Sequence, residues 1–258
     1  PVGGILARLA GRKFRKDGLR MIYTAHGFHF YNGAPKKNWI IYYPIEKFMS
    51  RYTDDLITIT EEDYKLARDR NFKGNIHHVH GVGVNTDKFV KLSEEDRQKL
   101  RLDKGYTDEF IILCTGELNK NKNQAKLINA MKEVVKKHPE AKLLLAGNGP
   151  EHDNLVKLIR DLNLGNNVEL LGYRTDIQDY VNICDLVVSA SYREGLPLNI
   201  MEAMICGKPV ITSDNRGHRE LIKDNENGKN NKLDNNKGFE NSINSLIENK
   251  KTVNYLCK

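Results

Sequence analysis

Residues 189–212 read SASYREGLPLNIMEAMICGKPVIT, and this stretch decides the fold. An apolar strand ends at Ala190, a turn that contains Glu194 follows, and Pro197 suits the first turn of a helix, where its missing N–H loses no partner. Gly207 ends that helix, and a second apolar strand starts almost at once. A strand, a turn, a helix and a further strand form the repeating unit of a doubly wound α/β fold.

The same alternation extends through most of the chain. Short apolar runs, typical of parallel strands covered on both faces, alternate with amphipathic stretches. The predicted strands are residues 21–25, 56–60, 76–80, 110–115, 142–146, 168–171, 186–190 and 209–212. The predicted helices are residues 38–52, 61–71, 123–138, 151–163, 175–184 and 197–206. This order predicts an α/β fold built on parallel sheets.

The alternation is interrupted at residues 81–85, GVGVN, and a polar segment, residues 91–107, precedes the next strand. We therefore predict two Rossmann-like domains, residues 1–84 and 85–258. The second domain has five or six strands, and its tail, rich in Asn and Lys, is expected to form a loop and one weak helix. The first domain has only three strand candidates and the chain begins at Pro1, so we expect the front of this domain to be missing.

Positive charge is concentrated at the start of the chain. Residues 1–50 contain nine Lys or Arg and two Asp or Glu, whereas the remaining residues contain 32 of each sign. The densest cluster consists of Arg12, Lys13, Arg15, Lys16 and Arg20. Two interpretations stay open: a solvated helix end and loop, or a surface that faces anionic lipid headgroups or a phosphorylated acceptor. Because no basic repeat interleaved with aromatic residues is present, we predict no nucleic-acid partner.

Cysteine usage and hydropathy indicate in which cellular compartment the protein is found. The four cysteines form no CxxC pair, and three of them lie in apolar runs; they are Cys114, Cys184, Cys206 and Cys257. This pattern predicts buried thiols in a reducing compartment and no metal site. No apolar run approaches the ~20 residues that cross a bilayer, and no secretory signal is visible. We expect a cytoplasmic protein whose basic first 50 residues could contact the inner face of an anionic membrane.

Several polar residues follow predicted strands, at the edge where doubly wound folds bind ligands. Glu194 and Glu202 would repel phosphate, but carboxylates accept hydrogen bonds from sugar hydroxyls. The amino terminus of the helix at Pro197 would receive a diphosphate, and so would the glycine turn at Gly116 with Lys122. The alternative is that both glutamates are surface charges and that Lys122 is a solvated lysine at a helix start. Taken together, the setting predicts a nucleotide-sugar site.

With seven residues between them, Glu194 and Glu202 resemble the Glu-x7-Glu motif of retaining glycosyltransferases of family 4, which have the GT-B fold. Residues 203–211, AMICGKPVI, are also similar to that family, and the likeness runs along nearly the whole chain. The resemblance implies that Glu202 binds the donor ribose and that Glu194 contacts the donor sugar. It also implies donor contacts, mainly through backbone amides that hold the diphosphate, from Gly195, Leu196, Pro197, Leu198 and Asn199.

Residues 116–123, GELNKNKN, are similar to the family's Gly-Arg-Leu loop, in which a lysine follows four residues after the leucine. The resemblance assigns Gly116 to the donor site and Lys122 to the leaving diphosphate. The family's arginine is replaced by Glu117, which resembles a subgroup of polysaccharide-assembly enzymes. Either Lys120 compensates for this carboxylate or Glu117 turns away. The turn Gly172, Tyr173 and Arg174 is implied to clasp the nucleotide base through backbone groups.

In the first domain, His26 follows a predicted strand and matches the family's active-site histidine, which contacts the donor sugar beside the reacting carbon. His29 is a weaker candidate for the same site. The aromatic residues Phe28, Phe30 and Tyr31 line either an acceptor pocket or the core. Residues 216–220, RGHRE, resemble the glycine-containing loop that lines the sugar pocket in the family.

The resemblance implies transfer of a sugar from a nucleotide-diphosphate donor, with a UDP-sugar as the default, and with retention at the anomeric carbon. The implied acceptor is a lipid-linked saccharide in capsule or exopolysaccharide synthesis. No enzymic nucleophile is needed, because the leaving phosphate takes the acceptor proton on the same face. We expect no cofactor, and the lack of an Asp-x-Asp clamp predicts a metal-independent enzyme. The alternatives are a non-catalytic fragment that binds nucleotide sugars and a sugar-nucleotide epimerase.

Overall fold

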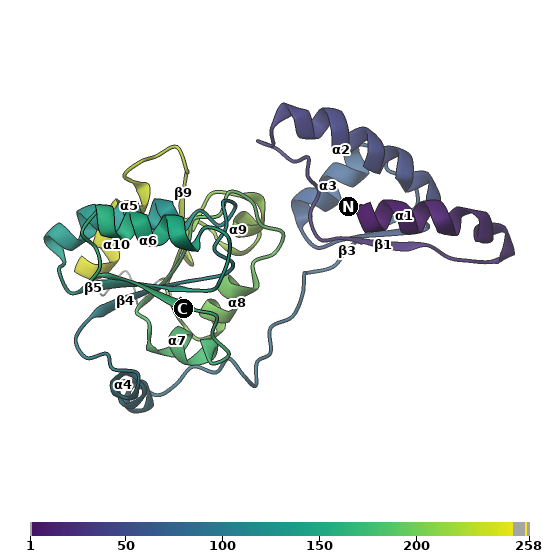
Figure 1. Cartoon of the computed structure of the whole chain (residues 1–258). Coiled ribbons are helices and arrows are strands. Elements are labelled where there is room, and N and C mark those ends of the chain that lie inside the picture. Colours follow the sequence, from purple (N-terminus) through teal and green to yellow (C-terminus); the bar gives the residue numbers. More distant parts are fainter. Residues whose placement is uncertain (1, 250–255, 257–258) are drawn as a thin grey trace. The chain divides into compact units, whose positions relative to one another are not determined.

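The computed structural model describes residues 2–249 and 256. The chain forms two compact units, Pro1–Val82 and Gly83–Lys258, and each is described by itself (Figure 1). The division falls within residues 81–85, where the sequence pattern is interrupted. Both units carry helices on purely parallel sheets, so the predicted α/β fold is confirmed.

Unit 1 is built on three parallel strands in the order β1–β2–β3. The strands are β1 (Ile22–Ala25), β2 (Asp55–Thr58) and β3 (Asn75–His78). The helices are α1 (Val2–Gly11), α2 (Lys36–Met49) and α3 (Glu61–Asp69), with short 3-10 helices at Arg12–Asp17 and Ser50–Tyr52. The predicted strand pattern is thus present, but helix α1 was not predicted.

The core of unit 1 is aromatic. The rings of Phe28 and Phe30 stack with centroids 4.8 Å apart, and Phe72 lies 5.6 Å from Phe28. Both Phe28 and Phe30 are buried. Phe30 is therefore a core residue, whereas Phe28 packs in the core and also lines a hollow together with His26 and His29.

Unit 2 has a six-stranded parallel sheet in the order β6–β5–β4–β7–β8–β9. The strands are β4 (Phe110–Thr115), β5 (Ala141–Ala146), β6 (Val168–Gly172), β7 (Leu186–Ser189), β8 (Val210–Ser213) and β9 (Lys229–Asn231). The chain adds β5 and β6 on one side of β4 and then returns to the other side for β7. The loops that follow β4 and β7 therefore diverge at the topological switch point, where such sheets bind ligands.

Helices cover both faces of this sheet (Figure 1). They are α4 (Glu94–Asp103), α5 (Gln124–Lys137), α6 (His152–Asp161), α7 (Ile177–Ile183), α8 (Leu198–Ile205), α9 (Arg216–Leu221) and α10 (Gly238–Glu248). Alternate residues of β4 point to opposite layers. Ile112 packs with residues of α5, α6 and α10, whereas Ile111 packs with residues of α7 and α8. Burial on both faces explains why the strands read as continuous apolar runs.

Three elements of unit 2 were missed in the sequence: α4, α9 and β9. Helix α4 occupies the polar segment 91–107, where the Ser93 side chain accepts a hydrogen bond from the backbone N–H of Asp96. This helix is attached to the sheet by charge, since Arg97 and Arg101 both pair with Asp185. The tail contains β9 as well as the predicted helix, here α10.

Two further predictions concern burial. Cys114, Cys184 and Cys206 are free and buried, as predicted, whereas Cys257 lies outside the described residues. Burial raises the pKa of the Cys114 and Cys184 thiols to about 12. Within residues 2–249, none of the helices combines the length and the apolar character that crossing a membrane requires.

Candidate functional site

A pocket of about 640 Å³ opens in unit 2 at the carboxyl ends of β4, β5 and β6. Its lining comes from the ends of these strands and the loops that follow them, from α7 and α8, and from the segment before α4. The lining residues are Lys88, Thr115, Gly116, Glu117, Ala146, Gly147, Asn148, Tyr173, Arg174, Thr175, Ile177 and Glu202. Four predicted donor residues are thus brought together, namely Gly116, Tyr173, Arg174 and Glu202.

Glycines let the three loops pack backbone against backbone. Gly116 and Gly147 have φ of 140° and 150°, a region that glycine adopts at little cost. A Cβ atom on Gly147 would lie 2.0 Å from the carbonyl oxygen of Gly116. The N–H of Gly147 donates to the carbonyl of Gly172 over 2.8 Å, and the N–H of Gly116 donates to Ala146 over 2.9 Å. Each loop is therefore held by the next one, and the wall of the pocket is preformed.

Glu202 and Lys88 both line this pocket, although they lie far apart in the sequence. Glu202 lies on α8 and is half-buried, and this burial raises its pKa, while the nearby Lys88 lowers it. Lys88 comes from the segment before α4, where the next residue, Phe89, is buried in the core. Sequence reasoning missed Lys88, because a single lysine before an anchoring aromatic residue carries no local signal.

Lys122 and Glu194 form an ion pair across the switch point. The Nζ atom of Lys122 lies 2.7 Å from Oε1 of Glu194, and both side chains are mostly buried. Lys122 follows β4 and Glu194 follows β7, so residues far apart in the sequence meet here. Neither lines the pocket itself, but the aliphatic part of Lys122 packs against Gly116, where a Cβ atom would lie 3.2 Å from its Cε atom.

The two loops that carry this pair are also joined by backbone contacts. The N–H of Tyr192 donates to the carbonyl of Asn121 over 2.8 Å, and the amide of Asn121 donates to the carbonyl of Arg193 over 2.9 Å. The ion pair therefore links two loops that these hydrogen bonds already hold together. An ammonium group and a carboxylate beside a pocket can stabilise a phosphate and a sugar hydroxyl, respectively.

The predicted diphosphate segment forms the start of α8, beside the pocket rather than in its lining. It comprises Gly195, Leu196, Pro197, Leu198 and Asn199, and the structure corrects the position of its proline. Pro197 precedes the helix as its N-cap, with φ −78° and ψ 105°, whereas the sequence placed it in the first turn. The segment is connected to the pocket by Asn199, whose amide donates to the carbonyl of Thr115 over 3.2 Å.

Glu117 is one of the residues that line the pocket, and it is exposed. Its carboxylate accepts a hydrogen bond of 2.8 Å from the amide of Asn119. Lys120 lines a neighbouring hollow with Asn123 and Tyr192, and among the described residues it forms no ion pair with Glu117. The suggested compensation by Lys120 is therefore not present in this structure.

The turn at the end of β6 combines a glycine in the left-handed conformation with a fixed cation. Gly172 has φ 67°, and its neighbour Tyr173 is 75% exposed. The Arg174 guanidinium donates two hydrogen bonds to Asp176, of 2.9 and 2.8 Å, and lies 5.0 Å from the ring centroid of Tyr180. Hydrogen bonds from Arg174 and Lys104 hold the pKa of the Asp176 carboxyl well below its usual range. Arg174 is thus a permanent positive charge at the pocket wall.

In unit 1, His26 follows β1 and is exposed, as expected for a residue at the carboxyl edge of the sheet. It lines a hollow of about 300 Å³ together with His29 and Tyr42, whose ring centroids lie 4.7 Å apart. A buried ion pair underlies this hollow, with 2.8 Å between Arg8 Nη2 and Glu46 Oε2. The predicted residues His26 and His29 therefore share one hollow.

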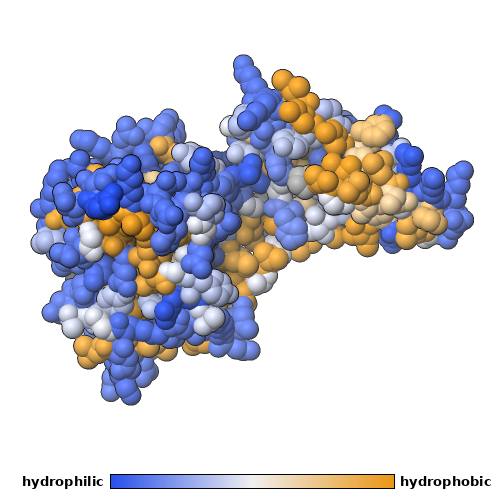
Figure 2. All heavy atoms as spheres, in the orientation of Figure 1, coloured by the Kyte–Doolittle hydropathy of each residue, from blue (hydrophilic) through white to orange (hydrophobic). Residues whose placement is uncertain are grey.

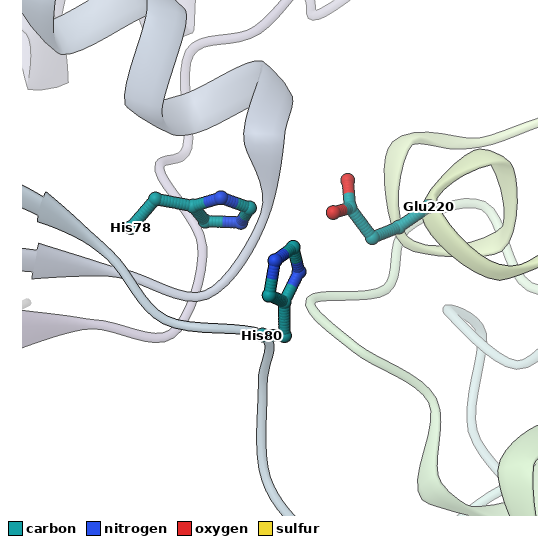
Figure 3. Close-up of side chains that lie close together, drawn as sticks. All are labelled: His78, His80 and Glu220. Atoms are coloured by element: carbon teal, nitrogen blue, oxygen red, sulfur yellow. The ribbon is translucent and has the colours of Figure 1, made fainter.

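Two further histidines lie at the end of unit 1. The rings of His78 and His80 meet edge to face with centroids 4.6 Å apart, and Figure 3 shows them with Glu220. His78 also pairs with Glu61 over 3.1 Å. Glu220 belongs to α9 of unit 2, and the arrangement of the two units is not determined. We therefore infer no metal site from these three residues, and the absence of a metal stays a prediction.

A parallel sheet with glycine turns and a pocket at the carboxyl ends of its strands is an α/β architecture of the doubly wound class, and the fold matches that of GT-B glycosyltransferases. Residues 93–258 match the family described as Glycosyl transferases group 1. The chain belongs to this family.

Individual relatives agree with this assignment. The chain is 46% identical over 230 residues to the protein EpsD of Bacillus subtilis, covering 88% of this chain and 60% of EpsD. It is 28% identical over 226 residues to the UDP-Gal:alpha-D-GlcNAc-diphosphoundecaprenol alpha-1,3-galactosyltransferase of Escherichia coli, covering 86% of this chain and 57% of that enzyme. The chain thus spans little more than half the length of these relatives.

Solved structures show the same fold. The crystal structure of Anabaena HepE in complex with UDP-glucose superposes with a TM-score of 0.82 at 24% identity, covering 98% of this chain and 70% of HepE. At this identity the likeness shows the fold alone.

Proposed function

We propose that this chain is part of a retaining family 4 glycosyltransferase that transfers a sugar from a UDP-sugar to a lipid-linked saccharide. The observation that carries the proposal is the preformed pocket with Glu202, flanked by the Lys122–Glu194 pair at the switch point. The Escherichia coli relative is named for a UDP-sugar donor and a diphosphoundecaprenol acceptor, and HepE was crystallised with UDP and with UDP-glucose. These names support the choice of donor and acceptor.

The pocket supports the following donor roles. Glu202 would accept hydrogen bonds from the ribose hydroxyls, since a half-buried carboxylate is a strong acceptor. The backbone of Gly172, Tyr173 and Arg174 would hold the base, and the N–H groups at the start of α8 would hold the diphosphate, beside the turn at Gly116. Lys88 adds a cation that faces Glu202 across the same pocket.

The chemistry then depends on positioning and charge. Lys122 would stabilise the negative charge that develops on the leaving diphosphate, and Glu194 would orient the donor sugar. In the structure these two groups bind each other, so the donor has to insert between them or share them. The leaving phosphate would take the acceptor proton on the same face, and His26 of unit 1 would contact the sugar near the reacting carbon. This scheme requires neither a metal nor a cofactor.

The acceptor side of the proposal rests on the surface of unit 1. A hollow of about 890 Å³ at the amino ends of β1, β2 and β3 is lined by six basic residues: Arg12, Arg15, Lys16, Arg20, Arg51 and Lys73. Among the described residues, only Arg15 and Arg20 of these six form ion pairs. Exposed apolar residues flank the hollow, namely Phe14, Leu19 and Phe48. Figure 2 also shows apolar side chains gathered over α1 and α2.

Cations beside exposed apolar residues suit the surface of an anionic membrane. We therefore propose a cytoplasmic protein that contacts the inner membrane face in capsule or exopolysaccharide synthesis. The test is sedimentation with phosphatidylglycerol vesicles and with phosphatidylcholine vesicles. The double variant Arg12→Ala/Lys16→Ala should weaken binding to the anionic vesicles about 30-fold, at ~1 kcal/mol for each charge. The control Lys132→Ala/Lys136→Ala on α5 should bind like the wild type, and equal loss in both variants would reject a specific surface.

The donor proposal is tested by calorimetry with UDP. The wild-type chain should bind with a Kd in the micromolar range, about −8 kcal/mol, and Glu202→Ala should lose most of this affinity. Glu133→Ala, on the exposed face of α5, is the matched control and should leave binding unchanged. A folded wild-type chain that ignores UDP but binds GDP or ADP would reject the choice of nucleotide.

A non-catalytic nucleotide-sugar-binding fragment is the second candidate. Glu117 favours it, because this exposed carboxylate lines the pocket where the diphosphate would bind and would repel it. Binding without turnover when an acceptor is supplied would support this alternative. Conversion of the donor without an acceptor would instead indicate an epimerase.

A further inference from the structure

Helix α9 begins in contact with the turn that carries Glu194. A Cβ atom on Gly217 would lie 2.3 Å from the carbonyl oxygen of Gly195 and 2.8 Å from Cβ of Glu194. Arg216 Nη2 donates to the carbonyl of Glu194 over 3.4 Å. The first turn of α9 therefore packs directly against the backbone of Glu194 and Gly195, with no space for even one additional methyl group.

A buried polar cluster holds this turn of α9 in place. The backbone N–H of His218 donates to Oδ1 of Asn215 over 3.1 Å, and the Asn215 amide donates to the carbonyl of Ser191 over 3.0 Å. Ser213 Oγ donates to the same carbonyl over 2.5 Å. All four residues are buried. The cluster thus connects the ends of β7 and β8 to α9, directly beneath the loop that leads to Glu194.

His218 is the largest member of this cluster and is fully buried. Its Nδ1 atom lies 2.7 Å from the carbonyl oxygen of Ser213 and 2.8 Å from the amide nitrogen of Asn215. The shorter contact is to a carbonyl, which can only accept, so we assign the ring proton to Nδ1; the Asn215 amide then donates to Ser191 and Ser213 rather than to the ring. Burial lowers the pKa of His218 to about 4, and the charges of Glu194 and Lys122 also act on it. The ring is therefore neutral near pH 7 and lies in the field of the ion pair.

We propose that His218 is a positioning residue for donor-sugar recognition, which acts by holding α9 against Glu194 and Gly195. The inference rests on the proposed function of Glu194 as the contact to the donor sugar. Because His218 is fully buried, it acts through Glu194 rather than on the ligand. The proposed nucleotide-binding residues Glu202 and Tyr173 lie on other elements, and they line a pocket that α9 does not line. Loss of His218 should therefore affect the sugar and spare the nucleotide.

The experiment compares the affinity for UDP with that for UDP-glucose, UDP-galactose and UDP-N-acetylglucosamine, all by calorimetry on the chain of residues 1–258. The quantity of interest is the ratio of the affinity for the best UDP-sugar to the affinity for UDP. In His218→Leu this ratio should fall about tenfold or more, while UDP affinity stays within about twofold. His218→Asn should restore most of the ratio, because the Asn amide can donate in place of Nδ1.

The control is Ile243→Ala, which opens a cavity in the core under α10 and destabilises unit 2 away from α9. The inference would be overturned if the ratio of UDP-sugar affinity to UDP affinity fell equally in this control. It would also be overturned if folded His218→Leu kept the wild-type ratio. If His218→Leu does not fold, Gly217→Ala tests the same contact and should lower the same ratio. A wild-type chain that binds none of the four ligands would reject the proposed function, and this inference with it. A wild-type chain that binds UDP while His218→Leu keeps its ratio would reject the inference alone.

Discussion

Replacing Gly147 by alanine should damage the donor pocket more than any exposed glycine replacement in unit 2. The new Cβ atom would lie 2.0 Å from the carbonyl oxygen of Gly116 and 2.8 Å from its carbonyl carbon, and both are backbone atoms that cannot rotate away. Overpacking of this kind costs about 1–3 kcal/mol. The backbone conformation, with φ 150°, adds about 1–3 kcal/mol for a residue with a side chain.

Two control variants separate these contributions. Gly105 has φ 83° but no atom within 4 Å of its Cβ position, so Gly105→Ala has only the conformational cost. Gly165 has neither constraint, so Gly165→Ala should be close to neutral. From most to least stable, the expected order is Gly165→Ala, Gly105→Ala and Gly147→Ala. Overpacking should make Gly147→Ala about 1–3 kcal/mol less stable than Gly105→Ala.

The assay is urea unfolding followed by far-UV circular dichroism, together with calorimetry of UDP binding. Trp39, the only tryptophan, lies in unit 1, so its fluorescence should not respond to any of the three replacements in unit 2. Gly147→Ala should also weaken UDP binding, because the displaced Gly116 loop lines the pocket. Equal stability of Gly147→Ala and Gly105→Ala would refute the argument that backbone contact shapes this wall.

Three other predictions follow from buried groups. The pKa of His218 is about 4 when folded and about 6.5 when unfolded, so only the unfolded chain takes up a proton between these values. The free energy of unfolding of unit 2 should therefore fall by about 2 kcal/mol between pH 7 and pH 5, as measured by urea unfolding. The variant His218→Asn should not show this fall. Glu46→Ala leaves the Arg8 guanidinium buried without its partner, which should destabilise unit 1 by about 3–5 kcal/mol, as measured by Trp39 fluorescence. The buried Cys114 thiol should stay unmodified by iodoacetamide at pH 8 in the native chain, and mass spectrometry that found it alkylated would contradict its high pKa.

Much of the fold could be predicted because its signals are local. A parallel strand that is buried on both faces is mostly apolar, so β4, β5 and β7 are visible as short apolar runs within strands of four to six residues. Pro197 and Gly207 mark the two ends of α8 for equally local reasons, since they restrict or relax a single backbone position. The position of Glu202 on that helix follows directly.

Helix α4 was missed because the contacts that hold it are not local. It is polar and lies on the outside of unit 2, so it has little apolar periodicity, and its attachment to the sheet depends on Arg97 and Arg101 reaching Asp185. The partner is more than 80 residues away in sequence. No pattern within the helix itself could have indicated that contact.

The sequence by itself determined the class of fold and the loops on which a ligand could bind. Only the tertiary structure decided which side chains meet there. The contact between Lys122 and Glu194 depends on β7 returning to the side of β4, and the support of Glu194 by His218 depends on where α9 starts after β8. Hydropathy reports whether a strand is buried but not which strand lies beside it, because apolar burial is non-directional. The order of the strands, and with it the composition of the site, is set by how the connecting helices pack.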